Sequence, residues 1–243
     1  MSPQRTPDGP PPPPAVQKLR IQYARRGRLR YSSTRDFGRA LERALRRAGV
    51  PMAYSAGFHP HPKISYANGA ATGAASEAEY FEISVTERVD PDALGRALDA
   101  ALPDGLDIVS VVEAQPGALA DRLQASRWLL EFPGVELADL DRAVEGFLAQ
   151  ERVEVSRMFK KGVKSYDARE PVIRAETGLS DEGCAILTMV VRHTTPAVRP
   201  DDVLSAITAA TSFAPTRSPK ATRLAQGIWS SETESVADPL ATD

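Results

Sequence analysis

A cluster of residues able to do acid–base chemistry lies in the stretch YSAGFHPHPKISY. It contains His59 and His61, two of the three histidines of the chain, with Lys63 beside them and Tyr54 and Tyr66 at its ends. Histidine titrates near neutral pH, so two histidines beside a lysine are groups that metal-independent RNA cleavage uses. Catalysis, contact with a bound nucleic acid, and a stiff turn held by the two prolines are all open interpretations.

Other kinds of site have little support in the sequence. Cys184 is the only cysteine, so the chain cannot build a disulfide or an iron–sulfur cluster from its own thiols. His193 is the only further imidazole, and no acid stands at a ligand spacing from the histidines. The glycine-rich stretch 69–73 lacks the lysine of a phosphate-binding loop. We therefore predict no metal and no cofactor.

Basic residues are concentrated near the N-terminus, although the formal net charge is only −2. Positions 18–47 hold eleven bases and two acids. Arginine suits bidentate contact with phosphate, and such a run weakens a fold unless a polyanion offsets it. A solvated helix face is the alternative interpretation. The predicted nucleic-acid contacts here are Arg25, Arg26, Arg28, Arg35, Arg39, Arg43, Tyr54, His59, His61 and Lys63.

A second basic patch follows Arg157 and is interleaved with Phe159 and Tyr166. Aromatic rings beside cations are typical of surfaces that stack unpaired bases, so we expect these rings to be available for stacking. A solvated loop is again the alternative. The predicted contacts of this patch are Lys160, Lys161 and Lys164.

The elements that must position these residues follow from the apolar periodicity. In the first half, Phe37, Leu41 and Leu45 fall at helical spacing, with Ser33 or Thr34 as N-cap. The arginines occupy the opposite side of that helix. We predict strands at 19–31, interrupted by a turn at 25–28, and at 52–56, 64–67, 78–85 and 106–112, and helices at 34–48 and 90–101.

The second half repeats this plan without a visible sequence repeat. We predict strands at 128–132, 153–157 and 184–192, helices at 137–148 and 200–210, an irregular or extended piece at 164–174 and a basic closing segment at 215–226. The order predicts an α+β fold of two ferredoxin-like (βαββαβ) halves, each an antiparallel sheet with helices on one face. We expect a disordered proline-rich N-terminus (1–15), halves at 16–114 and 127–229, and a flexible acidic tail (230–243).

The sequence offers no route into a membrane. It has no apolar run of the ~18–20 residues that a membrane-spanning helix needs, and its N-terminus lacks the apolar centre of a signal peptide. We expect a cytoplasmic protein.

Several stretches carry a family resemblance: RGRLRY at 26–31, ERALRRAG at 42–49, AYSAGFHPHPKI at 53–64 and SEAEY at 76–80. They resemble the radical SAM-associated (radical SAM-linked) family, a domain of unknown function that occurs alone in many actinobacteria and elsewhere joined to, or encoded with, a B12-binding radical SAM protein. The chain has no Cys-x-x-x-Cys-x-x-Cys, so it cannot itself hold the cluster of that chemistry. The resemblance implies an accessory role beside a partner enzyme.

Together these features predict a non-catalytic RNA-binding accessory protein that presents an RNA, with tRNA and rRNA as the first candidates, to a modification or processing enzyme. An endoribonuclease that uses His59 and His61, assisted by Lys63, is the second hypothesis. The third is a protein-interaction module whose arginine surface docks on an acidic partner.

Overall fold

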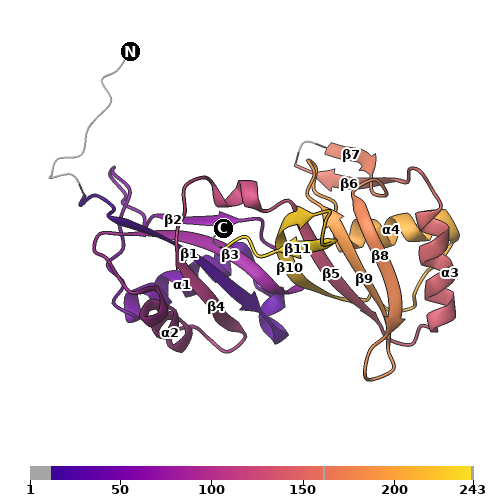
Figure 1. Ribbon diagram of the computed structural model, residues 1–243, viewed down its shortest axis with the longest axis horizontal. Coiled ribbons are helices and arrows are strands. Elements are labelled where there is room, and N and C mark those ends of the chain that lie inside the picture. The colour runs from indigo at the N-terminus through magenta and orange to yellow at the C-terminus, as the bar shows by residue number, and fades with distance from the viewer. Residues whose placement is uncertain (1–11, 161, 242–243) are drawn as a thin grey trace, which may run out of the picture. The chain divides into compact units, whose positions relative to one another are not determined.

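The computed structural model describes residues 12–160 and 162–241, which form an α+β fold with four α-helices and a large, mostly antiparallel sheet (Figure 1). The α+β class predicted from the sequence is confirmed. The chain divides into two compact units, each described by itself below: residues 12–72 and 78–120, and residues 73–77 and 121–241. Of the proline-rich segment expected to be disordered, 1–11 lie outside the described residues.

The first unit follows the predicted order of strands and helices. Its elements are β1 (Gln17–Arg25), the 3₁₀ turn η1 (Gly27–Tyr31), α1 (Thr34–Arg47), β2 (Ile64–Ala67), β3 (Ala75–Val85, of which the first three residues belong to the second unit), α2 (Pro91–Ala101) and β4 (Leu106–Glu113). The strand order is β4-β1-β3-β2. The β1–β4 and β2–β3 pairs are antiparallel.

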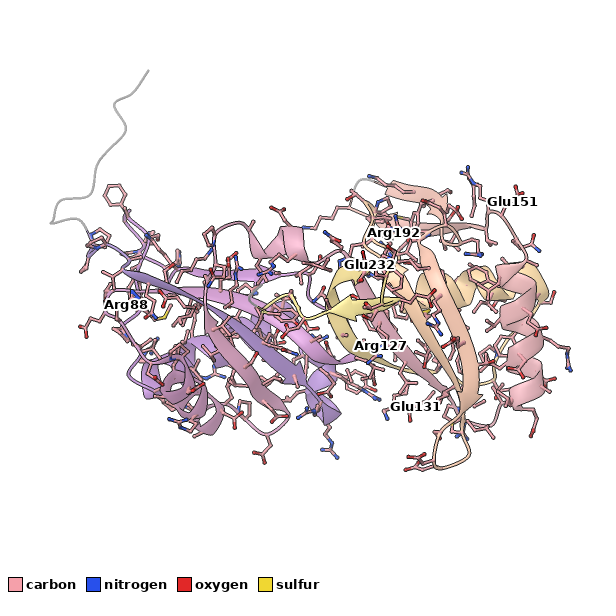
Figure 2. All side chains as sticks on the ribbon, in the orientation of Figure 1. Arg88, Arg127, Glu131, Glu151, Arg192 and Glu232 are labelled. Carbon is pink, nitrogen blue, oxygen red and sulfur yellow. The ribbon has the colours of Figure 1, made fainter. Side chains whose placement is uncertain are left out.

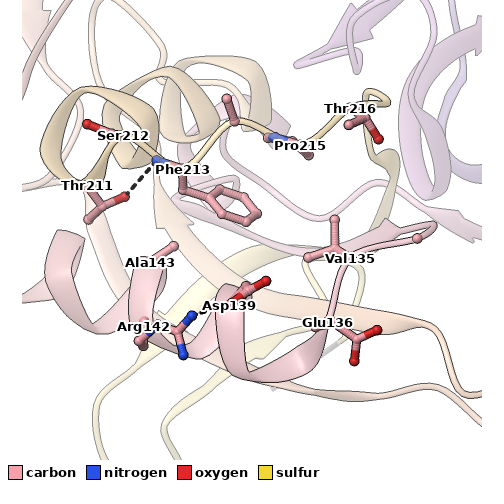
Figure 3. Close-up of a pocket in the computed structure, with 12 residues that line it drawn as sticks. Val135, Glu136, Asp139, Arg142, Ala143, Thr211, Ser212, Phe213, Pro215 and Thr216 are labelled. Atoms are coloured by element: carbon pink, nitrogen blue, oxygen red, sulfur yellow. Dashed lines mark hydrogen bonds and ion pairs between the residues drawn. The ribbon is translucent and has the colours of Figure 1, made fainter.

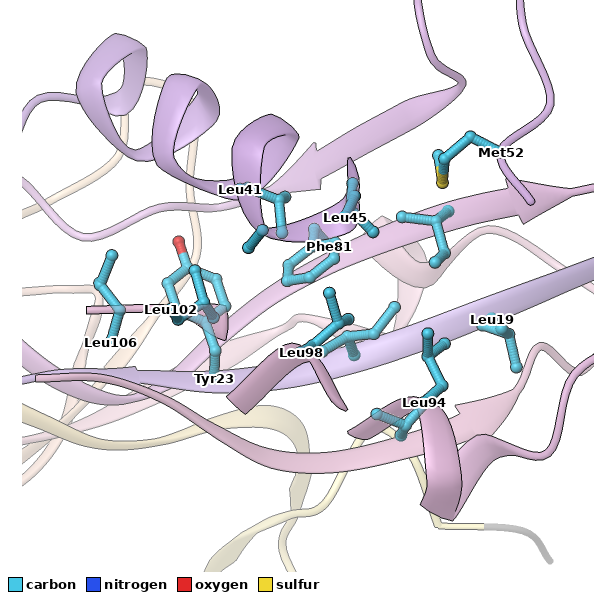
Figure 4. Close-up of a cluster of buried hydrophobic side chains, with 14 of the residues drawn as sticks. Leu19, Tyr23, Leu41, Leu45, Met52, Phe81, Leu94, Leu98, Leu102 and Leu106 are labelled. Atoms are coloured by element: carbon cyan, nitrogen blue, oxygen red, sulfur yellow. The ribbon is translucent and has the colours of Figure 1, made fainter. Parts of the chain in front are cut away.

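The core of the first unit forms where α1 and α2 cover the sheet (Figure 4). Leu41 and Leu45 of α1 contribute their apolar side to it, together with Phe81 of β3. Tyr23 of β1 stacks on Phe37 of α1 with ring centroids 4.2 Å apart. Full burial of such side chains stabilises a fold by about 1.5–3 kcal/mol each, so this cluster fixes the helix on the sheet. The opposite side of α1 is thereby left to solvent.

The second unit repeats the alternation of strands and helices, with an extra hairpin. Its elements are η2 (Leu119–Arg122, at the boundary), β5 (Ala125–Phe132), α3 (Leu137–Leu148), β6 (Glu154–Phe159), β7 (Gly162–Asp167), β8 (Val172–Leu179), β9 (Ala185–Arg192), α4 (Pro200–Thr211), β10 (Lys220–Ser230) and β11 (Ser235–Ala237). Its strand order is β10-β5-β9-β8, all antiparallel, with β11 on β10. The hairpin β6–β7 forms a separate two-stranded sheet.

Period-two alternation builds the core of this unit. Trp128, Leu130 and Phe132 of β5 are buried, opposite Met189, Leu187 and Ala185 of β9, respectively. The alternate positions are less buried. Arg127 is exposed, and Leu129 is half-buried. Glu131, labelled in Figure 2, is half-buried and forms an ion pair with Lys220 at 2.7 Å. The larger apolar residues of β5 therefore face the core.

Two expectations about local structure were wrong. The segment 27–31 forms η1 rather than a strand, since Gly27 takes a positive φ of 53° that turns the chain. The piece 164–174, expected to be irregular or extended, is largely extended, because it belongs to β7 and the start of β8. The tail after Ser230 contains β11, and Leu240 is buried. Gly227 permits this, because a Cβ there would collide with the carbonyl oxygen of Ala237.

Within the described residues, no helix is both long and apolar enough to cross a membrane.

Candidate nucleic-acid interface

Two arginines of the N-terminal basic run are buried. Arg20 is only 1% exposed; its Nε donates to Glu82 at 3.0 Å and its Nη2 to the carbonyl oxygen of Gly117 at 2.6 Å. Arg25 is 4% exposed, and its Nη2 donates to the carbonyl oxygens of Ala70 and Ala71. Arg25 therefore stabilises the interior of the unit by hydrogen bonds. It does not lie on the solvent-facing surface, where the sequence had placed it as a nucleic-acid contact. The alternation of Leu19, Ile21 and Tyr23 continues to Arg25 and could have predicted this.

Other members of the run are exposed or half-buried and are engaged within the protein. Lys18 forms an ion pair with Glu82 at 2.6 Å, and Arg26 forms one with Asp107 at 2.6 Å. The side chain of Arg30 donates to the hydroxyl of Tyr31 at 2.6 Å. Arg47 donates to the carbonyl oxygen of Ala101 in α2. Arg26 thus has a carboxylate partner that a bound phosphate would have to displace.

The remaining arginines stay open to solvent. Within the described residues they form no ion pair, and their side chains have no hydrogen-bond partner. They are Arg28 on η1 and Arg35, Arg39, Arg43 and Arg46 on α1. Side chains three or four residues apart share a helix face, so the last four form one row opposite the buried side. We call these four residues the arginine row.

The helix that carries the arginine row begins with a capping box. The Ser33 hydroxyl accepts from the Asp36 amide at 3.2 Å, while the Asp36 carboxylate accepts from the Ser33 amide at 3.3 Å. The Ser33 hydroxyl also donates to the Asp36 carboxylate at 2.7 Å. This bond and the bond from the Ser33 amide lower the pKa of Asp36, and the nearby Arg39 and Arg35 add to the effect. The acid of the first turn therefore satisfies backbone donors and stays ionised.

The histidine motif forms a narrow loop held by its own backbone. Tyr54 and Pro62 form an antiparallel bridge. Next to it, the Ser55 amide donates to the carbonyl oxygen of His61 at 2.9 Å, and the His61 amide donates to the Ser55 hydroxyl at 3.0 Å. His59 lies in the bend at the tip, with Gly57 at a φ of 130°. His59, His61 and Lys63 are all exposed.

Exposed aromatic rings accompany this loop. Phe58 at the tip is 61% exposed, Tyr54 44% and Tyr66 of β2 42%. Of these rings, only Tyr54 was predicted from the sequence as a contact. Phe58 lies between the turn residue Gly57 and the His59-Pro60 pair, and this position could have predicted its exposure.

The second basic patch differs from the first because its arginine is engaged. Arg157 of β6 forms an ion pair with Asp202 of α4 and donates to the carbonyl oxygen of Ala197 at 3.1 Å. Its guanidinium also lies 4.7 Å from the ring centre of Phe159 and 5.3 Å from that of Tyr166. These rings, expected to be available for base stacking, are instead packed around Arg157.

The exposed residues of this patch lie on both faces of the hairpin β6–β7. Lys160 and Lys164 are exposed, but Lys164 lies opposite Arg157 and its Nζ is 5.6 Å from the ring centre of Phe159. The cross-strand pair Met158 and Val163, on the other face, is 71% and 60% exposed. Lys161, predicted as a contact, lies outside the described residues. The structure thus gathers the arginine row and the histidine loop in the first unit, and leaves Lys160 and Lys164 in the second.

The glycine-rich stretch 69–73 is engaged by its neighbours. The Ala70 amide donates to the buried carboxylate of Glu79, at 3.1 Å to one oxygen. The Ala70 and Ala71 carbonyl oxygens accept from Arg25. The backbone of this stretch therefore contacts Glu79 and Arg25 of the same unit.

The third histidine, His193, is hydrogen-bonded to the buried Ser126, a residue that was not predicted from the sequence as part of a site. His193 Nδ1 lies 2.7 Å from the carbonyl oxygen of Leu123, so it carries the proton, and Nε2 accepts from the Ser126 hydroxyl at 2.7 Å. Burial lowers the pKa of His193, which favours this neutral form. Ser126 is 2% exposed, so the pair is closed to a large substrate. A serine on the buried side of β5 was the available signal.

The second unit also has a cavity of about 420 Å³ between α3 and the segment after α4 (Figure 3). Glu136, Asp139 and Arg142 supply its charged groups, and Ser212 and Phe213 lie on the other side. Asp139 and Arg142 form an ion pair with each other. None of the residues predicted from the sequence as contacts lines this cavity.

Comparison with known proteins gives a family but no activity. The model of the family DUF2344, described as uncharacterised proteins conserved in bacteria, matches residues 18–200. No curated protein matches the chain.

Among solved structures, a heme-bound variant of DypB from Rhodococcus jostii RHA1 is similar at 12% identity, with 81% of this chain and 84% of that chain covered and a TM-score of 0.22. A second crystal form of DyPB from the same organism is 12% identical over 88% of this chain and 92% of that chain, with a TM-score of 0.22. These scores are too low to support an argument about fold or function.

Proposed function

Because the chain belongs to DUF2344, a bacterial family whose description names no activity, we propose from the geometry that its first unit binds nucleic acid. The observation that carries the proposal is the arginine row. Four guanidinium groups on one exposed helix face form no ion pair within the described residues, although the whole chain has more acids than bases. Such a row repels itself and is relieved by a polyanion.

The proposed surface is smaller than the one expected from the sequence. It consists of Arg28 and the arginine row, with the exposed loop residues Tyr54, His59, His61 and Lys63. Arg25 is left out because it is buried, and Arg26 because Asp107 engages it. Lys160 and Lys164 are a separate candidate contact on the second unit.

We further propose that this binding is non-catalytic and serves a partner enzyme acting on RNA. His59 and His61 stand on an open loop, and neither lines the cavities at α3 or α2. General acid–base catalysis needs both groups held at a reacting phosphate, which a positioned pocket provides better than a loop tip. An accessory role beside a B12-binding radical SAM protein remains part of this proposal on the strength of the sequence resemblance alone.

The proposal also includes a ferredoxin-like plan for each unit. The strand orders β4-β1-β3-β2 and β10-β5-β9-β8 have the same pattern if β5, β8, β9 and β10 are taken as the four strands of the second unit. The hairpin β6–β7 is then an insertion between α3 and β8. This plan supports binding because it leaves α1 exposed on one side of a rigid sheet.

The test measures the binding of fluorescein-labelled RNA by fluorescence anisotropy. It compares the native chain with a variant in which two charges of the arginine row are reversed. We expect Arg39→Glu with Arg43→Glu to weaken binding at least about tenfold at low salt, since two cations become anions. The matched control is Arg88→Glu with Arg96→Glu, which makes the same charge change at exposed positions of the same unit; Arg88 is labelled in Figure 2.

An equal loss of RNA affinity in both double variants would mean that only the net charge matters. That result would contradict a specific binding surface. The same RNA is also examined for cleavage. Cleavage that is abolished by His59→Ala or His61→Ala, with the fold retained, would replace the accessory role with an endoribonuclease.

A further inference from the structure

One exposed ring of the first unit lies on the sheet face that α1 covers. Tyr66 is two residues after Ile64 in β2, and Ile64 packs with the core cluster beneath the helices. Tyr66 also lies opposite the core residue Phe81. Tyr66 is therefore on the helix side, at the margin that α1 leaves uncovered.

Tyr66 marks where this margin meets the first half of α1. Its ring packs edge-on against Phe37 with centroids 5.9 Å apart. A Cβ at Gly38 would come within 3.2 Å of its hydroxyl, so the glycine allows the ring to lie against the helix. Burial raises the pKa of Tyr66, and the nearby Glu42 adds to the shift. The exposed part of the ring thus stands beside the start of the arginine row.

Two more exposed rings lie in the segment between α1 and β2. The chain leaves α1 at Ala48 and reaches Met52, a member of the same cluster as Leu45, within four residues (Figure 4). Tyr54 follows at the start of the bridged loop, and Phe58 lies near its tip. We call Tyr54, Phe58 and Tyr66 the aromatic row.

We infer that the aromatic row and the arginine row together bind a single strand of nucleic acid with its bases unpaired. The arginine row sets the length of the bound segment. From Arg35 to Arg46 the helix rises ~17 Å. At about 3.4 Å per nucleotide, roughly five nucleotides fit along it.

The chemistry of each row decides which partner fits. Guanidinium groups contact phosphates, and exposed rings stack on the faces of bases regardless of sequence. The bases of a duplex are already stacked and paired, so their faces are not available to these rings. The arginine row alone would serve a duplex equally well; the aromatic row makes the surface selective for unpaired bases. This inference rests on the proposed function and adds the class of ligand.

The experiment compares a short single-stranded RNA with the duplex formed by the same strand and its complement, using the full chain. We expect the single strand to bind at least about tenfold more tightly, and Phe58→Ala to reduce that affinity by roughly five- to a hundredfold, as for loss of one stacked base. Phe58 is 61% exposed, so its removal spares the fold. Tyr31→Ala, at a ring 59% exposed on η1, is the matched control and should change little. Replacement of one base by 2-aminopurine gives a second measurement, because stacking on a ring quenches its fluorescence.

The outcomes separate the two proposals. Equal binding of strand and duplex, or a Phe58→Ala variant and a 2-aminopurine signal that both show no stacking, would overturn this inference. If Arg39→Glu with Arg43→Glu still weakened binding, the proposed function would stand without it. If that double variant also bound normally, both proposals would fall.

Discussion

The two basic patches look alike in the sequence but differ in what their cations do. The arginine row on α1 leaves four guanidinium groups in solvent, without an ion pair within the described residues. In the hairpin β6–β7, Arg157 is enclosed by Asp202, the Ala197 carbonyl oxygen and two aromatic rings. The first patch is free to bind a ligand, whereas the centre of the second holds the unit together.

The two patches differ because α4 has a buried acid near Arg157, whereas the acid at the start of α1 is exposed. Asp202 of α4 accepts from the Arg199 amide at 2.8 Å and is 7% exposed, so it lies inside, where Arg157 can reach it. Asp36 of α1 closes a capping box at an exposed helix end. A buried carboxylate requires a partner, and an exposed one does not. The number of basic residues in a segment therefore predicts a binding surface only after the bases that pair with buried acids have been subtracted.

The largest effect should come from removing the enclosed guanidinium. We expect Arg157→Met to lower the free energy of unfolding of the second unit by about 3 kcal/mol, because it leaves the Asp202 carboxylate buried without its charge partner. Arg39→Met should cost less than about 0.5 kcal/mol, since it removes only an exposed side chain. Urea unfolding followed by tryptophan fluorescence reports on the second unit, which contains Trp128 and Trp229, and circular dichroism covers both.

A double variant, Arg157→Met with Asp202→Leu, provides the control. It replaces the pair with apolar groups and should recover much of the loss, less the contribution of the α4 cap that Asp202 supplies. Similar costs for Arg157→Met and Arg39→Met would show that the two patches do not differ as described.

Strong periodic signals explain how much of the fold was predictable. The apolar spacing of 37, 41 and 45 and the Ser33 cap predicted α1, and the alternation in β5 and β9 predicted two buried strands. The hairpin strand β7 was not separated from the irregular or extended piece at 164–174, because its polar residues pair only with β6 and show no apolar period. The short strand β11 was missed because it depends on space left by Gly227, a long-range property that local pattern does not contain.

The candidate site was predictable to a lesser degree. The helix pattern placed Arg35, Arg39 and Arg43 opposite the buried side, where the structure has them exposed. The burial of Arg25 depends on carbonyl oxygens 45 residues away, and the capture of Arg157 depends on an acid 45 residues away. Such partners are set by the tertiary fold, so composition alone could not distinguish a free arginine from an engaged one.

A smaller effect should follow from opening the cap that starts the arginine-row helix. Ser33→Ala removes the acceptor of the Asp36 amide and should cost about 1 kcal/mol, seen as faster hydrogen exchange in the first turn of α1 while the hairpin β6–β7 is unchanged. Ser205→Ala, where the hydroxyl only donates to the Asp201 carbonyl oxygen of its own helix, is the matched control.

The cap also gives a pH test with a defined sign. The pKa of Asp36 is lowered in the folded state, so its contribution is present above the ordinary carboxyl pKa and is lost as the pH falls through the lowered value. Ser33→Ala should reduce this loss on the acid side. If stability fell equally at acidic pH in the native chain and in Ser33→Ala, the capping box would not stabilise the helix in solution.

The salt dependence of RNA binding should separate the patches more finely. For a single strand, each phosphate contact adds about 0.7 to the slope of log affinity against log salt concentration. Arg39→Met should therefore make the slope shallower by about 0.7, as measured by anisotropy between about 50 and 200 mM salt. Arg157→Met should leave it unchanged, because that guanidinium already serves Asp202. An equal change in both variants would place Arg157 among the phosphate contacts.

The smallest effect is expected at Tyr166, which packs against the same guanidinium. Its hydroxyl is buried and makes no hydrogen bond within the described residues, so Tyr166→Phe should change the free energy of unfolding at neutral pH by less than about 1 kcal/mol, in the stabilising direction. Burial raises the pKa of Tyr166 to about 12, and the neighbouring Asp202 adds to the shift.

The sign of the pH effect at Tyr166 follows from that raised pKa. The contribution of the neutral phenol is complete below the ordinary tyrosine pKa of about 10 and is lost as the pH rises toward the folded value. Urea unfolding across this alkaline range should show that loss in the native chain and a weaker loss in Tyr166→Phe. A Tyr166→Phe variant as unstable as Arg157→Met would make the hydroxyl the anchor of the hairpin. The guanidinium would then not be needed inside the second unit, and the contrast with the arginine row would lose its physical basis.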